Sequence, residues 1–406
     1  MRILISLGGA LLLLLIAWAL SSHRRAVRPR TVAVALALQV GLAVLIMYVP
    51  WGKRALDGAV RGVSHVVEYA NAGIEFVFGP NVADSLGFTI AFNVLPIIVF
   101  FAAIMSVLYY LGIMPWVVAA LGGGVRKLLG TTQAESMSAV SNIFVGHTEA
   151  PLVVRPYLAR MTESELFAVM TVGCATIAGT VMVAYAGMGV DLGHLITASF
   201  MGAPGGLLMA KIMIPETEPQ VRPFDPRDMG DEARPVNVFE ALGAGAATGL
   251  TLALNVGAML LAFVATIALV NGILGLLGGF IGYPDLTLQL ILGRLFAPVA
   301  YMIGVPWTEA VQAGTLIGEK VVVNEFYAYV HFVDIKASLS GGTQAIVTFA
   351  LCGFANLTSI AILLGGLGSI VPSRRSDIAR LGLRAVIGGT LANLMNATIA
   401  GIILSL

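Results

Sequence analysis

Long apolar runs alternate with short polar segments along this 406-residue chain. The clearest runs cover residues 3–20, 31–50, 86–110, 163–188, 194–214, 250–277, 343–370 and 384–405. A helix needs about 20 apolar residues to cross the hydrocarbon core of a bilayer, and these runs approach or exceed that length. The pattern therefore predicts an all-α polytopic membrane protein with eight transmembrane helices.

Composition supports this fold class and excludes others. Apolar residues make up 58% of the chain and charged residues 11%, against about 25% charged residues in a soluble domain. With a net charge of +1 and no basic patch interleaved with aromatics, the chain gives no argument for nucleic-acid binding. Cys174 and Cys352 lie in apolar runs and are expected to be buried side chains, not a disulfide. The histidines and cysteines lack metal-ligand spacing, and no organic cofactor is expected.

The N-terminal run allows either a cleaved signal peptide or a retained helix. Four arginines between positions 24 and 30 follow the apolar run 3–20 directly, and this flank is more positive than Met1-Arg2. Because positive flanks stay in the cytoplasm, we predict an uncleaved spanning helix with its N-terminus outside. Eight spans then put both termini on the outer side of the membrane.

Most of the other cations follow the same rule, with Lys53, Arg54 and Arg61 as the exception. Segments 21–30, 155–160, 215–236 and 373–380, together with Arg126-Lys127, are expected in the cytoplasm, and Lys211 is counted with these cations. Residues 51–76 form an amphipathic stretch that is expected to lie flat in the interface. Residues 215–236 read as a solvated loop that joins two halves of the chain.

The two halves share an architecture. Each has a segment too broken to be a simple span and then an interrupted helix, at 130–160 and 163–188 in the first half and at 287–331 and 343–370 in the second. Corresponding interrupted segments in halves of opposite orientation indicate an inverted-repeat transporter. The expected parts are N-terminal scaffold and interfacial helices over 1–110, a first repeat over 111–214, the polar loop 215–236, a scaffold helix over 237–283, and a second repeat over 284–406 with its last helix at 378–405.

A single carboxylate accompanies each break, Glu149 in the first half and Glu325 in the second. An ionised side chain at membrane depth costs about 2.5–3.5 kcal/mol or more on insertion scales. Such residues are therefore rare and usually mark a path for a substrate or an ion.

The first break has the composition of a re-entrant hairpin tip. Gly146 tolerates a tight reversal, and Pro151 favours the first turn of a new helix. Between them lie the hydrogen-bonding side chains His147, Thr148 and Glu149. Non-helical backbone at membrane depth is tolerated where protein or a water-filled cavity surrounds it. The alternative is a packed hairpin whose polar residues only cap helix ends.

The second interrupted helix carries Asn356, Thr358 and Ser359 beside Phe354. An amide, two hydroxyls and an aromatic face suit a flat, polar, hydroxylated molecule. Hydrogen bonding between helices explains the same residues in many membrane proteins. These residues leave both interpretations open when taken without the two carboxylates.

Five strings resemble signature stretches of the concentrative nucleoside transporter family. They are Asn142–Pro151, Ser164–Met170, Ala203–Leu208, Asn324–Tyr329 and Cys352–Asn356. The resemblance runs from about residue 86 to the C-terminus, and several long strings in the same order make it specific.

The resemblance implies a nucleoside symporter of the bacterial inner membrane with two opposed re-entrant hairpins. The family assembles as a homotrimer, and its transport domain moves like an elevator against a scaffold. By position, His147, Thr148 and Glu149 would face the nucleobase, Glu325, Asn356 and Ser359 would hold the ribose, and Val181 and Phe354 would supply apolar contact. Sodium would bind the side chains of Asn142 and Thr176 and the backbone carbonyls of Val145, Thr176 and Ile177.

Two positions depart from the family pattern. His147 stands where the family commonly has Gln, which offers a donor and an acceptor together. Neutral His does so in one tautomer, so base preference and pH response are open. Thr176 stands where Ser is common and keeps the hydroxyl.

The sequence thus predicts a non-enzymatic, sodium-driven importer of nucleosides such as uridine, cytidine and adenosine. Proton coupling through His147 and the two glutamates is the alternative within this class. An intramembrane hydrolase and a channel are remote alternatives, because the chain has no nucleophile elbow, no catalytic pairing and no metal cluster.

Overall fold

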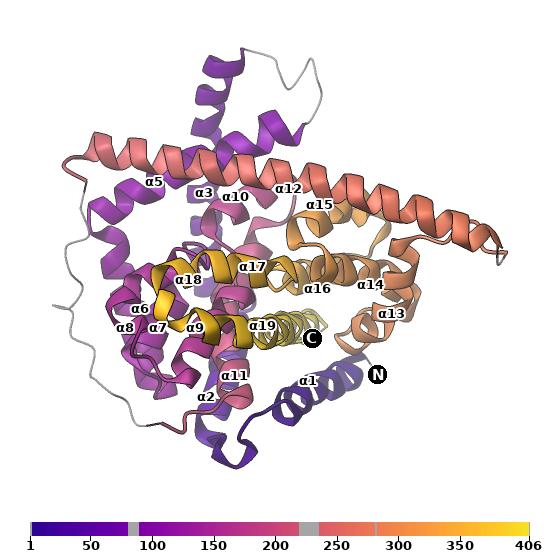
Figure 1. The fold of residues 1–406 in the computed structure, drawn as a ribbon, viewed down its shortest axis with the longest axis horizontal. Helices are drawn as coiled ribbons and strands as arrows, with labels where there is room; N and C mark the ends of the chain where they lie inside the picture. The colour runs from indigo at the N-terminus through magenta and orange to yellow at the C-terminus, as the bar shows by residue number, and fades with distance from the viewer. Residues whose placement is uncertain (1, 80–88, 219–234, 281, 406) are drawn as a thin grey trace.

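The computed structural model describes residues 2–79, 89–218, 235–280 and 282–405, and every regular element in these ranges is a helix, as predicted (Figure 1). In the first half the helices are α1 (Arg2–Ala19), α2 (Pro29–Met47), α3 (Pro50–Phe78), α5 (Leu95–Tyr110), α6 (Ile113–Leu129), α7 (Gln133–Ser141), α8 (Arg155–Leu158), α9 (Glu163–Ala175), α10 (Gly179–Gly187) and α11 (Leu192–Met213). The second half has α12 (Val238–Phe280), α13 (Leu288–Met302), α14 (Trp307–Val322), α15 (Glu325–Ile335), α16 (Gly341–Leu351), α17 (Thr358–Gly365), α18 (Leu367–Ile370) and α19 (Arg375–Leu404). Short helical turns complete the list: η1 (Arg24–Ala26), η2 (Ile90–Val94), η3 (Ala150–Val154), η5 (Lys336–Ser338) and η6 (Pro372–Arg374).

Within the described residues, each predicted span coincides with one helix or with two or three consecutive helices. Among the described residues, six helical segments are long and apolar enough to cross a membrane, or seven if the bent pair α13–α14 counts as one. The run 343–370 is divided between shorter helices, and α1 falls just below the length limit.

Two groups of helices differ strongly in burial. The long helix α12 is 6% buried over its most apolar window, and it packs along α5. Gly249 permits this close approach, because a Cβ atom there would lie 2.8 Å from the Cα atom of Val99. In contrast, α9–α10 is 94% buried, α11 is 89% buried and α19 is 83% buried. These helices pack on one another with α16, α2 and α1, so they form the core that positions the site.

Four breaks interrupt helices inside this core. They separate α7 from η3, α9 from α10, α14 from α15, and α16 from α17. The breaks bond to one another: Gly179 N donates to Phe144 O at 3.0 Å, Phe354 N to Thr176 O at 3.2 Å, and Leu357 N to Val321 O at 3.2 Å. Backbone groups freed by the breaks are thus satisfied by other breaks, as a membrane interior requires.

The segment 287–331, predicted as one hairpin, contains three helices. The axes of α13 and α14 differ by 116°. Gly304 sits at this bend with a φ of +111°, a backbone conformation that glycine adopts easily, and Pro306 is the N-cap of α14. The break beside Glu325 is a second one, between α14 and α15.

Lys211 was counted with the cations of the cytoplasmic loops, but it does not lie in a solvated loop. Lys211 belongs to α11, where it is 9% exposed. Its ammonium forms an ion pair with Glu135 of α7 and donates to Ser164 Oγ at 3.0 Å. This pairing lets a cation remain inside the protein, where an unpaired charge would be strongly unfavourable. Cys174 and Cys352 are buried and free, as predicted.

Candidate substrate site and ion site

A cavity of about 140 Å³ lies where the four breaks meet. All eight residues that the sequence suggested for a substrate line it: His147, Thr148, Glu149, Val181, Glu325, Phe354, Asn356 and Ser359. They come from four separate parts of the chain, the segment before η3, helix α10, the start of α15, and the break that leads into α17. The cavity joins two carboxylates to an amide, hydroxyls and aromatic faces, a set suited to a neutral polar ligand with several hydroxyl groups.

Glu325 is fixed by neutral donors. The Asn356 side-chain amide donates to Glu325 Oε2 at 2.8 Å, and the Tyr185 hydroxyl donates to Glu325 Oε1 at 3.2 Å. Asn324 caps α15 by accepting a hydrogen bond from Tyr327 N at 2.8 Å, which sets the first residue of the helix at the break. The carboxylate therefore has a defined orientation without a direct ion pair, and it retains acceptor capacity for ligand hydroxyls.

Asn356 organises the break between α16 and α17. Its Oδ1 atom accepts hydrogen bonds from Ser359 N at 2.9 Å, Ser359 Oγ at 3.1 Å and Thr358 Oγ1 at 2.5 Å. The Ser359 hydroxyl also bonds the Phe354 carbonyl. One amide thus connects Glu325 to the first turn of α17, so these residues act as a unit.

His147 and Phe354 form the opposite part of the lining. Their ring centroids lie 4.8 Å apart with an interplanar angle of 59°. His147 is 7% exposed, and within the described residues neither of its ring nitrogens has a hydrogen-bond partner. Buried polar atoms are normally bonded, so two free ring nitrogens at a cavity wall indicate a ligand or water partner.

Sequence reasoning missed two parts of this site. Leu252, Val256, Met259 and Leu260 of α12 form an apolar wall, and their run showed no feature that distinguished them from lipid-facing residues. Tyr185 does have a signal, because it lies four residues after Val181 on α10 and therefore on the same face of that helix. Asn324, Thr180 and Ile362 also line the cavity.

Beside the cavity, the residues suggested for sodium lie around the end of α9. Asn142 is 1% exposed, and within the described part of the chain its Oδ1 atom has no hydrogen-bond partner. A Cβ atom built on Gly173 of α9 would lie 3.6 Å from this oxygen, which shows that the amide faces the last turn of α9. Thr176 follows that turn and is 1% exposed, with its hydroxyl donating to Val172 O at 2.9 Å. The hydroxyl oxygen keeps lone pairs, so an orphaned amide oxygen and a buried hydroxyl fit a hard cation such as sodium.

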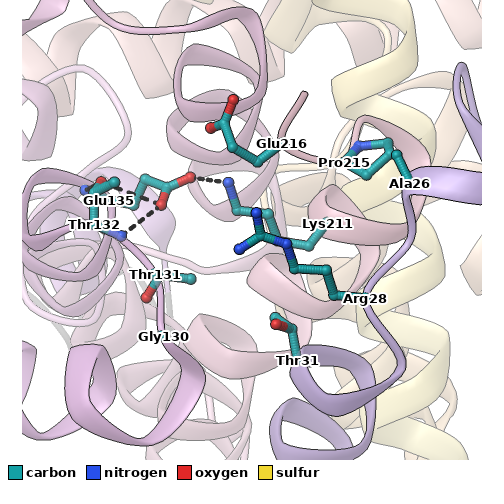
Figure 2. Close-up of a pocket in the computed structure, with 10 residues that line it drawn as sticks. All are labelled: Ala26, Arg28, Thr31, Gly130, Thr131, Thr132, Glu135, Lys211, Pro215 and Glu216. Carbon is teal, nitrogen blue, oxygen red and sulfur yellow. Dashed lines mark hydrogen bonds and ion pairs between the residues drawn. The ribbon is translucent and has the colours of Figure 1, made fainter. Parts of the chain in front are cut away.

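Several buried charges were not predicted as such. Glu319 is 0% exposed and bonds His331 Nδ1 at 2.8 Å. Lys320 is 1% exposed. A smaller pocket, of about 40 Å³, surrounds the Glu135–Lys211 pair. Arg28 and Glu216 also line it (Figure 2). Its cations and carboxylates balance, and the pair joins α7 to α11, so we interpret it as a structural contact.

The described residues contain no group of three or more His, Cys, Asp or Glu side chains that could hold a metal ion. The candidate ion site around Asn142 and Thr176 offers neutral oxygens instead. Such a donor set gives weak, reversible binding, which suits an ion that is cargo and not a resident cofactor.

Three family models match the chain: "Na+ dependent nucleoside transporter N-terminus" over residues 8–81, "Nucleoside recognition" over 91–191, and "Na+ dependent nucleoside transporter C-terminus" over 194–401. The nucleoside permease NupC of Helicobacter pylori is 51% identical, over 99% of this chain and 98% of that protein. The solved structure of CNTnw in an inward-facing substrate-bound state is 53% identical with a TM-score of 0.95, over 100% of this chain and 98% of that chain. A CNTnw variant in an outward-facing state gives a TM-score of 0.97 at 52% identity, over 100% of this chain and 99% of that chain.

Proposed function

Because this chain belongs to the concentrative nucleoside transporter family, we propose that it imports nucleosides by symport with sodium. The chain is a multi-pass membrane protein with an elevator-type transporter fold, and its family consists of transporters and not enzymes. The proposal adds the substrate class, the coupling ion and the residues that bind them.

The observation that carries the proposal is the cavity between the breaks, in which Glu325 is held by two neutral donors. We assign Glu325, Asn356 and Ser359 to the ribose, because a fixed carboxylate and a hydroxyl can accept hydrogen bonds from two neighbouring sugar hydroxyls. His147, Thr148 and Glu149 are assigned to the nucleobase, and Val181 and Phe354 to apolar contact with its faces. The apolar wall formed by α12 would close the cavity on the side of the less buried helices.

The coupling ion is assigned to Asn142 and Thr176, with the carbonyls of Val145, Thr176 and Ile177. Support comes from the unpartnered Asn142 amide oxygen and from the sodium dependence named in the matching family models. An ion there would order the segment that carries His147 and Glu149, so sodium and nucleoside would bind cooperatively. Thermodynamic linkage requires the effect to be reciprocal.

We further propose that the protein works in a bacterial inner membrane as a homotrimer with both termini outside. The apolar, weakly buried surface of α12 supports an assembly or lipid contact on that side. The side of each terminus follows from the arginines between α1 and α2 and the positive-inside rule.

Uridine uptake by a Glu325→Gln variant tests the proposed site. We expect uptake to fall by about 100-fold, since the amide loses charge-assisted hydrogen bonds worth about 1.5–3 kcal/mol. Glu68→Gln is the matched control, because Glu68 is exposed on α3 and bonds only His65 among the described residues. Uptake by the folded Glu325→Gln protein at the level of Glu68→Gln would disprove the assignment.

A further inference from the structure

Lys320 is a buried cation that the proposed binding roles do not use. It lies near the end of α14 and is 1% exposed. Within the described residues its ammonium has no carboxylate oxygen within 4.0 Å. It donates instead to Ala350 O at 3.1 Å and to Asn393 Oδ1 at 2.6 Å. Because lysine is almost never fully buried without compensation, this charge must be balanced by its wider surroundings.

Two helix ends supply part of that balance. The Asn393 amide donates to Ala175 O at 2.7 Å and to Cys352 O at 2.8 Å. Ala175 is the last residue of α9, and Cys352 follows the last residue of α16. The C-terminal end of a helix carries partial negative charge. The ammonium and the amide therefore join the C-terminal ends of both interrupted helices.

The Glu325 carboxylate supplies the rest of the negative charge that balances Lys320. Lys320 precedes Val321, whose carbonyl accepts a hydrogen bond from Leu357 N at 3.2 Å, and Asn356, next to Leu357, bonds the Glu325 carboxylate. Opposite charges at this separation attract each other through the protein interior, although among the described side chains the carboxylate bonds only the neutral groups of Tyr185 and Asn356. Glu149 is the other carboxylate at the cavity, and the described residues that line the cavity include no lysine or arginine. In their ionised forms the two site carboxylates outnumber the one buried ammonium, which leaves one negative charge uncompensated.

We propose that Lys320 is a fixed internal cation that balances one of the two site carboxylates, so that the empty site takes up a single sodium ion with each nucleoside. This inference rests on the sodium symport proposed above. The assigned ion ligands are close to the network, because Thr176 follows Ala175 and its carbonyl accepts a hydrogen bond from Phe354 N at 3.2 Å. Lys320 is thus a positioning residue that sets the charge of the site and does not contact the ligand.

The sign of the effect follows from Coulomb's law. Replacing Lys320 by a neutral residue leaves the site with two negative charges, so it should hold sodium more tightly. Replacing Glu325 by glutamine leaves the site neutral, so it should hold sodium more weakly. Replacing both returns the site to one negative charge and to an affinity near that of the wild type.

Sodium titration of thermal stability without nucleoside, with choline as the replacement cation, tests this inference in the full-length protein. For the wild type we expect saturation by one ion. For Lys320→Met we expect the apparent Kd for sodium to fall about tenfold, and for Lys320→Arg, which keeps the charge, no more than a threefold change. A mere packing role for Lys320 would not tighten sodium binding, so an unchanged or higher Kd in folded Lys320→Met overturns the inference.

If Lys320→Met alone does not fold, two further variants test the inference. They are Glu325→Gln and the double variant Lys320→Met/Glu325→Gln. We expect an approximately tenfold higher Kd for Glu325→Gln and a value within threefold of the wild type for the double variant. A double variant as weak as Glu325→Gln, or a wild type that binds two sodium ions, overturns the inference but leaves the symport proposal standing. A wild type that sodium does not stabilise at all contradicts the proposed function itself.

Discussion

The side-chain amide of Asn356 donates a hydrogen bond to Glu325 Oε2 at 2.8 Å, between residues that are 31 positions apart in the chain. The bond crosses from the break in the α16–α17 segment to the first residue of α15. It orients a buried carboxylate with a neutral donor, so the charge stays available to a ligand. Most of the proposed ribose site depends on this one contact.

Asn356→Ala removes both the donor to Glu325 and the acceptor that holds Thr358 and Ser359. We expect the KM for uridine to rise at least tenfold, because each bond to a charged group contributes about 1.5–3 kcal/mol. Radiolabelled uptake at several uridine concentrations measures this. Asn271→Ala is the control, since its amide also bonds side and main chains but lies outside the cavity. Equal KM values for the two variants would contradict the assigned role.

His147 is expected to determine base preference. His147→Gln offers a donor and an acceptor together, so the ratio of uridine to adenosine kcat/KM should change by about tenfold, the equivalent of one hydrogen bond. The sodium dependence of uptake should stay within a factor of three, because the ring is not an assigned ion ligand. An unchanged uridine-to-adenosine ratio would show that this side chain does not contact the base.

Thr176→Val keeps the shape of the side chain and removes the oxygen assigned to sodium. We expect the sodium concentration for half-maximal uridine uptake to rise at least tenfold, with a smaller effect at saturating sodium. Thr171→Val is a close control on α9, just before Thr176, because the Thr171 hydroxyl is likewise buried and, unlike that of Thr176, has no hydrogen-bond partner among the described groups. A similar sodium dependence in both variants would remove Thr176 from the ion site.

The Glu135–Lys211 pair of Figure 2 is expected to act on stability. Glu135→Met or Lys211→Met alone leaves an unpaired buried charge and should lower the free energy of unfolding by about 3–5 kcal/mol, whereas the double replacement should be nearly neutral. Thermal denaturation in detergent measures the difference. Glu163→Gln breaks the exposed ion pair with Arg380, and it should lower the free energy of unfolding by no more than about 1 kcal/mol. A double variant as unstable as either single one would contradict this.

Much of the fold and site could be predicted because membrane physics leaves strong signals. Apolar runs located the spans, and the expense of a buried carboxylate singled out Glu149 and Glu325. The polar break in the second interrupted helix pointed to Phe354 and Asn356, resemblance to a family added Val181, and all of these line one cavity. Lys211 was misplaced because a sequence does not reveal that a distant Glu135 neutralises it. Lys320 and Glu319 were overlooked because their burial depends on how α14 packs. The position of the bend at Gly304, and the separate helix α15 within the predicted hairpin segment, were also not foreseen.

Uridine accumulation in proteoliposomes with separately imposed gradients tests the central claim, sodium-driven nucleoside import, most directly. The account predicts that an inward sodium gradient drives radiolabelled uridine above its external concentration and that a pH gradient without sodium does not. Accumulation driven by the pH gradient alone, or no accumulation under a sodium gradient, would contradict it.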